Sequence, residues 1–265
     1  MDTNKLLSLI NIPESSYRLK DNRIFLVDPP GDAPVSSEND EKIFQKERWT
    51  NWRRHGWIYL RKHLTPIDSE AVVVDVGAGR VRYRDLISRF GNYIGVDFIP
   101  YDLIKVVTDI TQPLPFKDGV ADVVILSNTL EHVPTPGPLL RECYRILKKK
   151  GVLIGIVPFL VKIHLEPYDF FRYTHYMLKR LMAKSGFSAD SLEIISLDTP
   201  LDLYKTVQRN FFSYLYGGVA SRRDKMLAAL AARLNSGLNK FFSPLYKKIK
   251  SSPKFTGGYG FRAVK

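Results

Sequence analysis

The chain has 265 residues, 45% of them hydrophobic and 12% aromatic, so it can bury one sizeable core and is not an intrinsically disordered protein. The formal net charge of +13 indicates an anionic partner, such as nucleic acid, an anionic lipid surface or an acidic substrate. Cys143 is the only cysteine, which excludes a disulfide within one chain and favours the cytoplasm. Neither a signal peptide nor a membrane-spanning helix is expected.

An N-terminal extension is predicted over residues 1–64. Residues 1–40 are expected to be irregular, with a turn-rich loop at 28–34. Residues 40–64 are expected to be helical, and they carry three tryptophans among several arginines. Such a stripe favours a helix that packs on the core and exposes a basic face, and a lid over an active site is the alternative.

A strand, a glycine turn and an acid form the most informative pattern of the chain. The β-branched run at 71–76 predicts a buried parallel strand, and the turn Gly77-Ala78-Gly79 that follows it lets a ligand approach the backbone. A second strand at 93–97 ends in Asp97, where an acid can accept hydrogen bonds from the hydroxyls of a ribose. These residues together predict a site for an adenosine-containing cofactor.

Asp75 narrows the choice of cofactor. Its carboxylate lies two residues before the first turn glycine, where it would repel the pyrophosphate of a dinucleotide. The third glycine of the dinucleotide pattern is also replaced, by Arg82. A cofactor with a positive charge and no phosphate fits this turn better. S-adenosylmethionine is such a molecule, and a nicotinamide cofactor is disfavoured.

The central region alternates strands and helices, which predicts a Rossmann-like α/β domain with a parallel sheet and helices on both faces. Further strands are expected at 105–108, 122–127 and 152–157, and helices at 82–90, 137–149 and 175–185. Lys148, Lys149 and Lys150 are expected at the C-terminal end of the second helix, closed by Gly151. A sixth strand at 192–198 and a final one at 258–264 complete the predicted sheet.

Polar residues follow the third and fourth strands. Asp109 and Ile110 come after the third strand, where a carboxylate could accept from the amine of an adenine, although such an acid more often caps a turn or helix. Asn128 and His132 follow the fourth strand, whose carboxyl end should open onto the same crevice.

In their order, these motifs resemble the class I S-adenosylmethionine-dependent methyltransferases, in the branch of small-molecule and ubiquinone-type enzymes. The resemblance covers residues 70 to 190, roughly, and implies a seven-stranded, mostly parallel sheet with an antiparallel last strand. Many members have a small residue at the place of Val81. The resemblance also implies a cofactor site in which Asp75, Gly77, Ala78 and Gly79 line the methionine end, Asp97 holds the ribose, Phe98 covers the adenine, Asp109 and Ile110 frame it, and Asn128 lies beside the sulfonium.

The segment 164–174 is similar to a block in bacterial methyltransferases of surface-polysaccharide and glycan pathways. His164 is a candidate general base, Asp169 could orient its imidazole, and Arg172 could hold an acidic group of the substrate. His132 is the competing base. The structural alternative is that Asp169 and Arg172 pair with each other and cap the next helix. No residue is assigned to a metal.

Residues 200–256 are predicted to be a basic amphipathic helical insertion, so that the cofactor domain comprises 65–199 and 257–265. Lysines, arginines and aromatic residues are interleaved there, and leucines recur at helical spacing. Such a segment is typical of a membrane-surface element, and a flap packed on the domain is the alternative. Binding of an anionic membrane through 205–250 is therefore expected.

The resulting hypothesis is transfer of a methyl group from S-adenosylmethionine to an oxygen or nitrogen of a small-molecule, glycan or lipid-linked acceptor. The enzyme mainly needs to align donor and acceptor, so a general base is helpful but not obligatory. A nucleic-acid-binding protein on this fold and a non-catalytic scaffold are the alternatives; the sequence contains no recognised RNA-binding module. The expected location is the cytoplasm, with peripheral association at the inner face of the membrane.

Overall fold

A computed structural model of the protein describes residues 1–30, 45, 49–218, 221–246 and 251–265. The second half of the predicted 28–34 loop lies outside these residues, as does most of the segment 40–48 that was expected to begin a helix. Three of the lysines of the insertion, Lys247, Lys248 and Lys250, also lie outside them.

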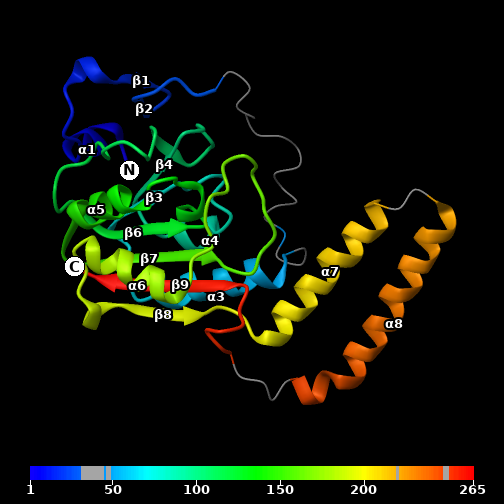
Figure 1. The fold of residues 1–265 in the computed structure, drawn as a ribbon. Coiled ribbons are helices and arrows are strands. Elements are labelled where there is room, and N and C mark those ends of the chain that lie inside the picture. The colour runs from blue at the N-terminus through cyan, green and yellow to red at the C-terminus, as the bar shows by residue number, and fades with distance from the viewer. Residues whose placement is uncertain (31–44, 46–48, 219–220, 247–250) are drawn as a thin grey trace.

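A nine-stranded sheet forms the centre of the molecule, in the order β1-β2-β5-β4-β3-β6-β7-β9-β8 (Figure 1). The pairs that connect β2 to β7 through the middle of the sheet are parallel, whereas β9 pairs antiparallel with both β7 and β8. The strands are β1 (Arg18–Lys20), β2 (Arg23–Phe25), β3 (Val72–Val76), β4 (Asn92–Asp97), β5 (Ile104–Val107), β6 (Ala121–Ser127), β7 (Leu147–Pro158), β8 (Glu193–Ser196) and β9 (Gly258–Val264).

The predicted Rossmann-like sheet with an antiparallel last strand is confirmed, but the number of strands is larger than seven. The two additional strands, β1 and β2, form an antiparallel hairpin whose second strand pairs parallel with β5. Residues 1–40 are therefore not wholly irregular. The hairpin lacks a strong sequence signal because β1 is exposed throughout and alternation cannot develop over three residues.

Helices cover both faces of the sheet, as predicted, and each face has its own apolar core (Figure 1). Leu6, Leu140 and Leu178 belong to the core on one face, and Leu60 and Ile87 belong to the core on the other. The helices are α1 (Thr3–Ser8), α3 (Asn51–Leu64), α4 (Arg84–Ile87), α5 (Pro136–Ile146), α6 (His175–Lys184), α7 (Pro200–Gly218) and α8 (Arg222–Tyr246), with short 3-10 turns at Glu14–Ser16, Leu130–His132 and Ala189–Ser191.

Two predicted helices end earlier than expected. The helix expected at 82–90 is one turn long, and the helix expected at 137–149 stops at Ile146. The expectation for Lys148, Lys149, Lys150 and Gly151 was therefore wrong, because these residues lie in β7. The side chain of Leu147 is fully buried opposite Ala121, and Lys148 Nζ lies 2.8 Å from the Asp122 carboxylate, so the start of β7 is held by its neighbour β6.

The insertion is an α-helical hairpin of α7 and α8 that projects away from the sheet (Figure 1). Gln208 Nε2 donates a 2.7 Å hydrogen bond to Asn235 Oδ1 between the two helices, and Leu203 is buried at the root of α7. Among the described residues, no helix combines the length and the apolar character that crossing a bilayer requires.

Gly155, in the middle of β7, allows β9 to approach. An alanine there would place its Cβ inside the ring of Phe261, and both positions are buried. We expect Gly155→Ala to reduce the free energy of unfolding by about 1–3 kcal/mol, because the core must move to admit one methyl group. Urea denaturation would measure this change. Gly91→Ala is the matched control, because no described atom lies within 4 Å of its added Cβ; an equal loss in both variants would contradict the explanation.

Candidate active site

The carboxyl ends of the parallel strands meet at one edge of the sheet, and the connections reverse direction there. The chain passes from β3 to β4 and β5 on one side, and then to β6 and β7 on the other. Open α/β sheets bind their ligands at such a switch point, outside the carboxyl ends of the strands. The turn after β3 and the segment after β6 are therefore the two walls of a candidate site.

The glycine turn after β3 is held against β4 and leaves room beside it. The amide nitrogens of Gly77 and Ala78 both donate to the carbonyl of Val96, at 2.9 and 3.1 Å. Gly77 and Gly79 have φ angles of +70° and +55°. A Cβ at Gly77 would overlap the Thr129 side chain, whereas no described atom lies within 4 Å of a Cβ placed at Gly79. There is therefore room beside Gly79 for the close approach of a ligand that the sequence predicts.

Asp97 lies at the end of β4 and faces the same turn. Its Oδ2 accepts a 2.8 Å hydrogen bond from the Gly79 amide, and its Oδ1 accepts a 3.0 Å bond from the Ile99 amide. A carboxylate has about four acceptor positions, so positions remain for ribose hydroxyls. Burial raises the pKa of this carboxyl group. Phe98, the next residue, is 43% exposed, which is unusual for a large apolar side chain and suits a face on which a base could stack.

Asp75 does not lie on the surface of the turn but beneath it. Its side chain is fully buried and accepts hydrogen bonds from the hydroxyls of Tyr83, at 2.8 Å, and Tyr93, at 2.7 Å. Burial raises its pKa to about 7, against the two tyrosine hydrogen bonds, which lower it. The carboxyl group behind the glycine turn therefore has a pKa close to neutral pH.

The Asp75→Asn variant should gain stability relative to the natural protein as the pH rises toward 7. Because the folded pKa of Asp75, about 7, lies above its ordinary value of 3.8, the natural protein loses stability as the pH rises from about 4 to about 7, and the loss levels off above the folded pKa. An asparagine keeps an acceptor for the tyrosines and does not titrate. The unfolding free energy of the variant relative to the natural protein should increase by about 1–2 kcal/mol between pH 5.5 and pH 8. A pH-independent difference would contradict the assignment.

The remaining residues predicted to bind the cofactor differ in burial, hydrogen bonding and backbone conformation. Asp109 Oδ1 accepts from the amide nitrogen and the hydroxyl of Thr111, at 2.8 and 2.7 Å, as in a turn cap. Ile110 is half-buried beside it. Asn128 has a φ of +55°, a conformation that non-glycine residues adopt rarely and that is concentrated at functional sites. Val81, the departure from the family pattern, has a φ of +45° and packs in the core.

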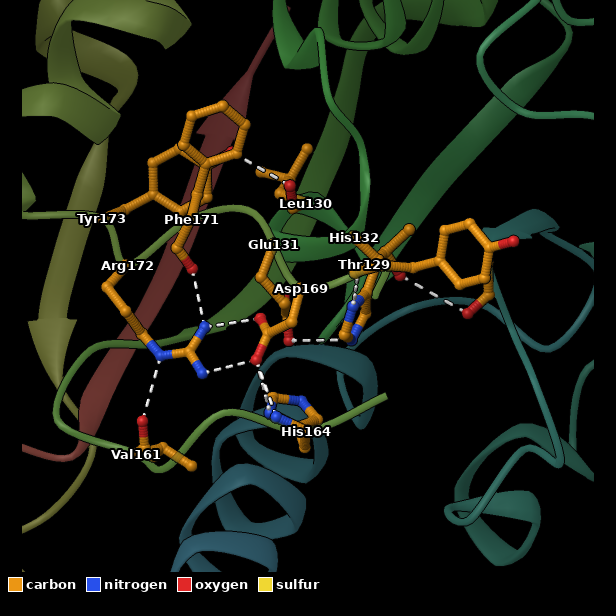
Figure 2. Close-up of polar contacts among 12 residues, drawn as sticks. Thr129, Leu130, Glu131, His132, Val161, His164, Asp169, Phe171, Arg172 and Tyr173 are labelled. Carbon is orange, nitrogen blue, oxygen red and sulfur yellow. Dashed lines mark hydrogen bonds and ion pairs between the residues drawn. The ribbon is translucent and has the colours of Figure 1, made fainter. Parts of the chain in front are cut away.

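Asp169 and Arg172 form a closed pair, as the structural alternative stated, but they do not cap α6, whose N-cap is Thr174. The Arg172 guanidinium donates to both carboxylate oxygens of Asp169, at 2.6 and 2.7 Å, and also to the carbonyls of Val161, Lys162 and Phe171 (Figure 2). The hydrogen bonds from Arg172 hold the pKa of Asp169 well below its ordinary value. Most donors of Arg172 are thus used inside the protein, which leaves it little capacity to hold a substrate anion.

The two candidate bases lie together although 32 positions separate them. The imidazole rings of His132 and His164 meet edge to face, with centroids 5.0 Å apart. Asp169 contacts His164, as expected, through a 3.2 Å approach of Oδ2 to Nδ1. Burial lowers the pKa of His132, so its imidazole is neutral at pH 7. All four predicted catalytic residues therefore belong to one cluster (Figure 2).

Glu131 also belongs to this cluster, although the sequence analysis assigned it no catalytic or binding role. Its side chain is fully buried, and neither carboxylate oxygen has a hydrogen-bond partner among the described residues. Burial raises its pKa to about 8. The adjacent backbone is well anchored, since the Glu131 carbonyl accepts from Phe170 at 2.8 Å. Its place after the fourth strand puts it near the carboxyl end of the sheet, but nothing in the sequence indicates that it is buried without a partner.

Thr129 connects the cluster to the cofactor turn. Its hydroxyl donates to the carbonyl of Val76 at 3.1 Å, and its side chain fills the space that a Cβ at Gly77 would need. Glu131 and His132 follow within three residues, in the turn Leu130–His132. The turn that carries Glu131 and His132 is therefore anchored, through Thr129, to the glycine turn where the methionine end of a cofactor is expected.

The comparison with protein families shows which known domains this part of the chain resembles. Residues 74–155 match the family model described as a methyltransferase domain, and they contain the glycine turn, Asp97, Asn128, Glu131 and His132. This segment is similar to methyltransferase domains. The nine-stranded sheet is accordingly the Rossmann-like sheet of that class, extended at one edge by the β1–β2 hairpin.

Curated relatives of the methyltransferase domain are mycobacterial. A protein of Mycobacterium tuberculosis named a probable S-adenosylmethionine-dependent methyltransferase is 29% identical over 117 residues, which are 40% of this chain and 42% of that protein. An uncharacterised methyltransferase of a Mycobacterium species is 33% identical over 92 residues, 31% of this chain and 36% of that protein. The chain thus spans about two fifths of the length of the curated relatives it matches.

Solved structures share the fold over a larger part of the chain. A SAM-dependent methyltransferase from Archaeoglobus fulgidus superposes with a TM-score of 0.51 at 18% identity, covering 85% of this chain and 99% of that one. Phosphoethanolamine N-methyltransferase 2 of Haemonchus contortus, in complex with S-adenosyl-L-methionine, has a TM-score of 0.51 at 17% identity, covering 85% of this chain and 55% of that one. These similarities show that the methyltransferase fold extends beyond residues 74–155.

Proposed function

We propose that this protein transfers a methyl group from S-adenosylmethionine to an oxygen or nitrogen atom of a small-molecule, glycan or lipid-linked acceptor. The observation that carries the proposal is the open space at Gly79, bordered by the Asp97 carboxylate and followed by the exposed ring of Phe98. The match of residues 74–155 to a methyltransferase domain and the names of the mycobacterial relatives support it.

The residues around this space suit each part of the cofactor. Asp97 retains acceptor positions for the two ribose hydroxyls, and Phe98 offers an apolar face to the adenine. The turn Gly77–Gly79 allows the methionine end to lie close to the backbone, and Asn128 approaches it from the end of β6. Asp75 adds negative charge behind the turn when it is ionised, which favours a sulfonium over a phosphate.

The chemistry requires little of the protein beyond alignment. A lone pair of the acceptor forms a bond to the methyl carbon while the carbon–sulfur bond breaks, and its electron pair remains on sulfur, which becomes a neutral thioether. Holding the two reactants in line provides most of the acceleration. The proton that the acceptor loses can pass to solvent, and the imidazole of His132 or of the neighbouring His164 is a candidate base that would assist its removal.

Isothermal titration of the purified protein with S-adenosylhomocysteine tests the cofactor, with NADH as the control ligand. We expect stoichiometric binding of the former and none of the latter. If a folded sample binds neither ligand, the proposal fails and a scaffold or nucleic-acid role takes its place. Binding of NADH alone would identify a dehydrogenase instead.

We also propose that the α7–α8 hairpin attaches the protein to an anionic membrane surface, at the inner face of the cytoplasmic membrane. Leu227, Leu230, Leu234 and Leu238 recur along one stripe of α8, and each is more than half exposed. Val207, Phe211 and Tyr214 form a similar exposed stripe on α7. Exposed lysines and arginines accompany both stripes, such as Arg209, Arg233 and Lys240. An apolar stripe beside basic charge suits the boundary between headgroups and acyl chains. A lipid-linked acceptor would then be within reach of the site.

Sedimentation with phosphatidylglycerol vesicles tests the attachment, with phosphatidylcholine vesicles as the neutral control. Replacing Leu230, Leu234 and Leu238 by serine should abolish co-sedimentation, whereas Leu19→Ser, an equally exposed leucine on β1, should not. Added salt should weaken the binding, because lysines and arginines contribute to it. Equal sedimentation of the triple variant and the natural protein would exclude this role for the hairpin. Binding to single-stranded RNA but not to vesicles would favour a nucleic-acid partner.

A further inference from the structure

We propose that Glu131, His132 and His164 bind a divalent transition-metal ion beside the cofactor site. One ligand atom from each of these residues lies within 4.8 Å of the others, and the three side chains are turned toward one another (Figure 2). Sequence reasoning treated the histidines as bases and assigned no residue to a metal. The geometry of their ring nitrogens points to coordination instead.

The Nδ1 atom of each of the two histidines contacts only hydrogen-bond acceptors, namely backbone carbonyls and a carboxylate. Nδ1 of His132 lies 2.6 Å from the Tyr168 carbonyl. Nδ1 of His164 lies 3.2 Å from the Lys162 carbonyl and 3.2 Å from Asp169 Oδ2. In the neutral form of either ring, these contacts favour the hydrogen on Nδ1 and leave Nε2 with a free lone pair. Metal-binding histidines are oriented in this way, by a carbonyl or a carboxylate behind the ring.

Glu131 can supply the negative charge that such a site needs when a bound cation displaces its proton. Its Oε1 lies 3.8 Å from Nε2 of His132, and its carboxylate is fully buried without a hydrogen-bond partner among the described residues. A buried carboxylate without a partner is costly, and a bound cation would satisfy both of its oxygens. Metal–ligand distances of about 2.0–2.2 Å place neighbouring ligand atoms about 3–4 Å apart, so small side-chain rotations would complete the site.

The ligand set selects the class of metal. Two imidazoles and one carboxylate suit Zn²⁺, Fe²⁺, Co²⁺ or Mn²⁺, whereas Mg²⁺ and Ca²⁺ prefer oxygen ligands alone. Arg172 does not oppose the cation strongly, because its charge is paired with Asp169 at 2.6 Å. Three protein ligands leave further coordination positions open, and His164 is 34% exposed, so solvent or a substrate atom can reach this side of the cluster.

This arrangement narrows the acceptor class, an inference that rests on the proposed methyl transfer. Thr129 joins the cluster to Gly77, so an ion held there would stand next to the expected position of the methyl donor. A metal ion binds a hydroxyl oxygen and lowers its pKa, which favours loss of its proton to water and exposes a lone pair to the methyl carbon. Acceptors that present a hydroxyl group are therefore favoured over amines.

Titration of the chelator-treated, full-length protein with Co²⁺ alone tests the site, because the visible bands of Co²⁺ report its coordination. We expect one equivalent to bind and Zn²⁺ to displace it. His132→Ala and His164→Ala should each weaken binding at least about 10-fold, and Asp169→Asn, which acts through His164, should weaken it about 10–100-fold. His175→Ala is the matched control, because His175 lies at the start of α6, outside the cluster.

The outcomes separate this proposal from the proposed function. All proteins are also titrated with S-adenosylhomocysteine, and their folding is checked by circular dichroism. Natural protein that binds S-adenosylhomocysteine but not Co²⁺ would reject the metal site alone, and failure to bind either would reject both proposals. Co²⁺ binding that His132→Ala and His164→Ala leave unchanged would also reject the site. If His132→Ala does not fold, the partly exposed His164 provides the decisive variant.

Discussion

Replacing Asp97 by alanine is expected to weaken the binding of S-adenosylhomocysteine at least about 30-fold, which corresponds to about 2 kcal/mol. The variant loses the charged acceptor for the ribose hydroxyls. It also frees the Gly79 amide, which now donates to Asp97 Oδ2 at 2.8 Å, so the turn itself loses an anchor on β4. Both effects act on the cofactor site, and isothermal titration measures their sum.

Asp102→Ala is the matched control for this experiment, because Asp102 is an exposed acid in the connection that follows β4. Its removal changes the net charge equally and should leave the affinity unchanged. Asp97→Asn keeps an acceptor for Gly79 and should be intermediate. If alanine at position 97 leaves S-adenosylhomocysteine binding intact, the position of the cofactor site is wrong.

Replacing Arg172 by alanine is expected to destabilise the protein by about 3–5 kcal/mol at pH 7, because it leaves a buried carboxylate without its partner. Asp169 is only 1% exposed, and Arg172 donates to both of its oxygens. Arg172 also donates to the carbonyls of Val161 and Phe171, so the segment that carries His164 loses several anchors together. Urea denaturation measures the loss.

The double variant Asp169→Ala/Arg172→Ala separates the charge from the packing. It removes the buried carboxylate as well, so it should recover part of the stability that Arg172→Ala loses. The pH provides a second check. Because the pKa of Asp169 is lowered below its ordinary value of 3.8, the pair stabilises the fold above pH 4 and this contribution is lost on acidification. A double variant less stable than Arg172→Ala would contradict the explanation.

Most of the fold could be predicted from patterns that are local in the sequence. A strand that is buried on both faces is apolar at most positions, so β3 and β6 are recognisable as β-branched or aliphatic runs, interrupted only by Asp75 in β3 and by Asp122 and Ser127 near the ends of β6. The hairpin β1–β2 escaped prediction because an exposed three-residue edge strand needs no such pattern. The start of β7 was misjudged for a related reason. Three lysines are typical of a helix end, and only the pairing of Leu147 with Ala121 makes them part of a strand.

The sequence by itself determined the glycine turn and Asp97, because the close approach of backbone and ligand demands glycine and the acid follows at the end of the next strand. It could not determine the environment of Asp75, which depends on the hydroxyls of Tyr83 and Tyr93 from other elements. The tertiary structure alone decided that Asp169 is closed by Arg172 and that Glu131, His132 and His164 converge. His164 lies more than 30 positions from Glu131 and His132, and chemistry built from long-range contacts leaves no periodic or local pattern in a single chain.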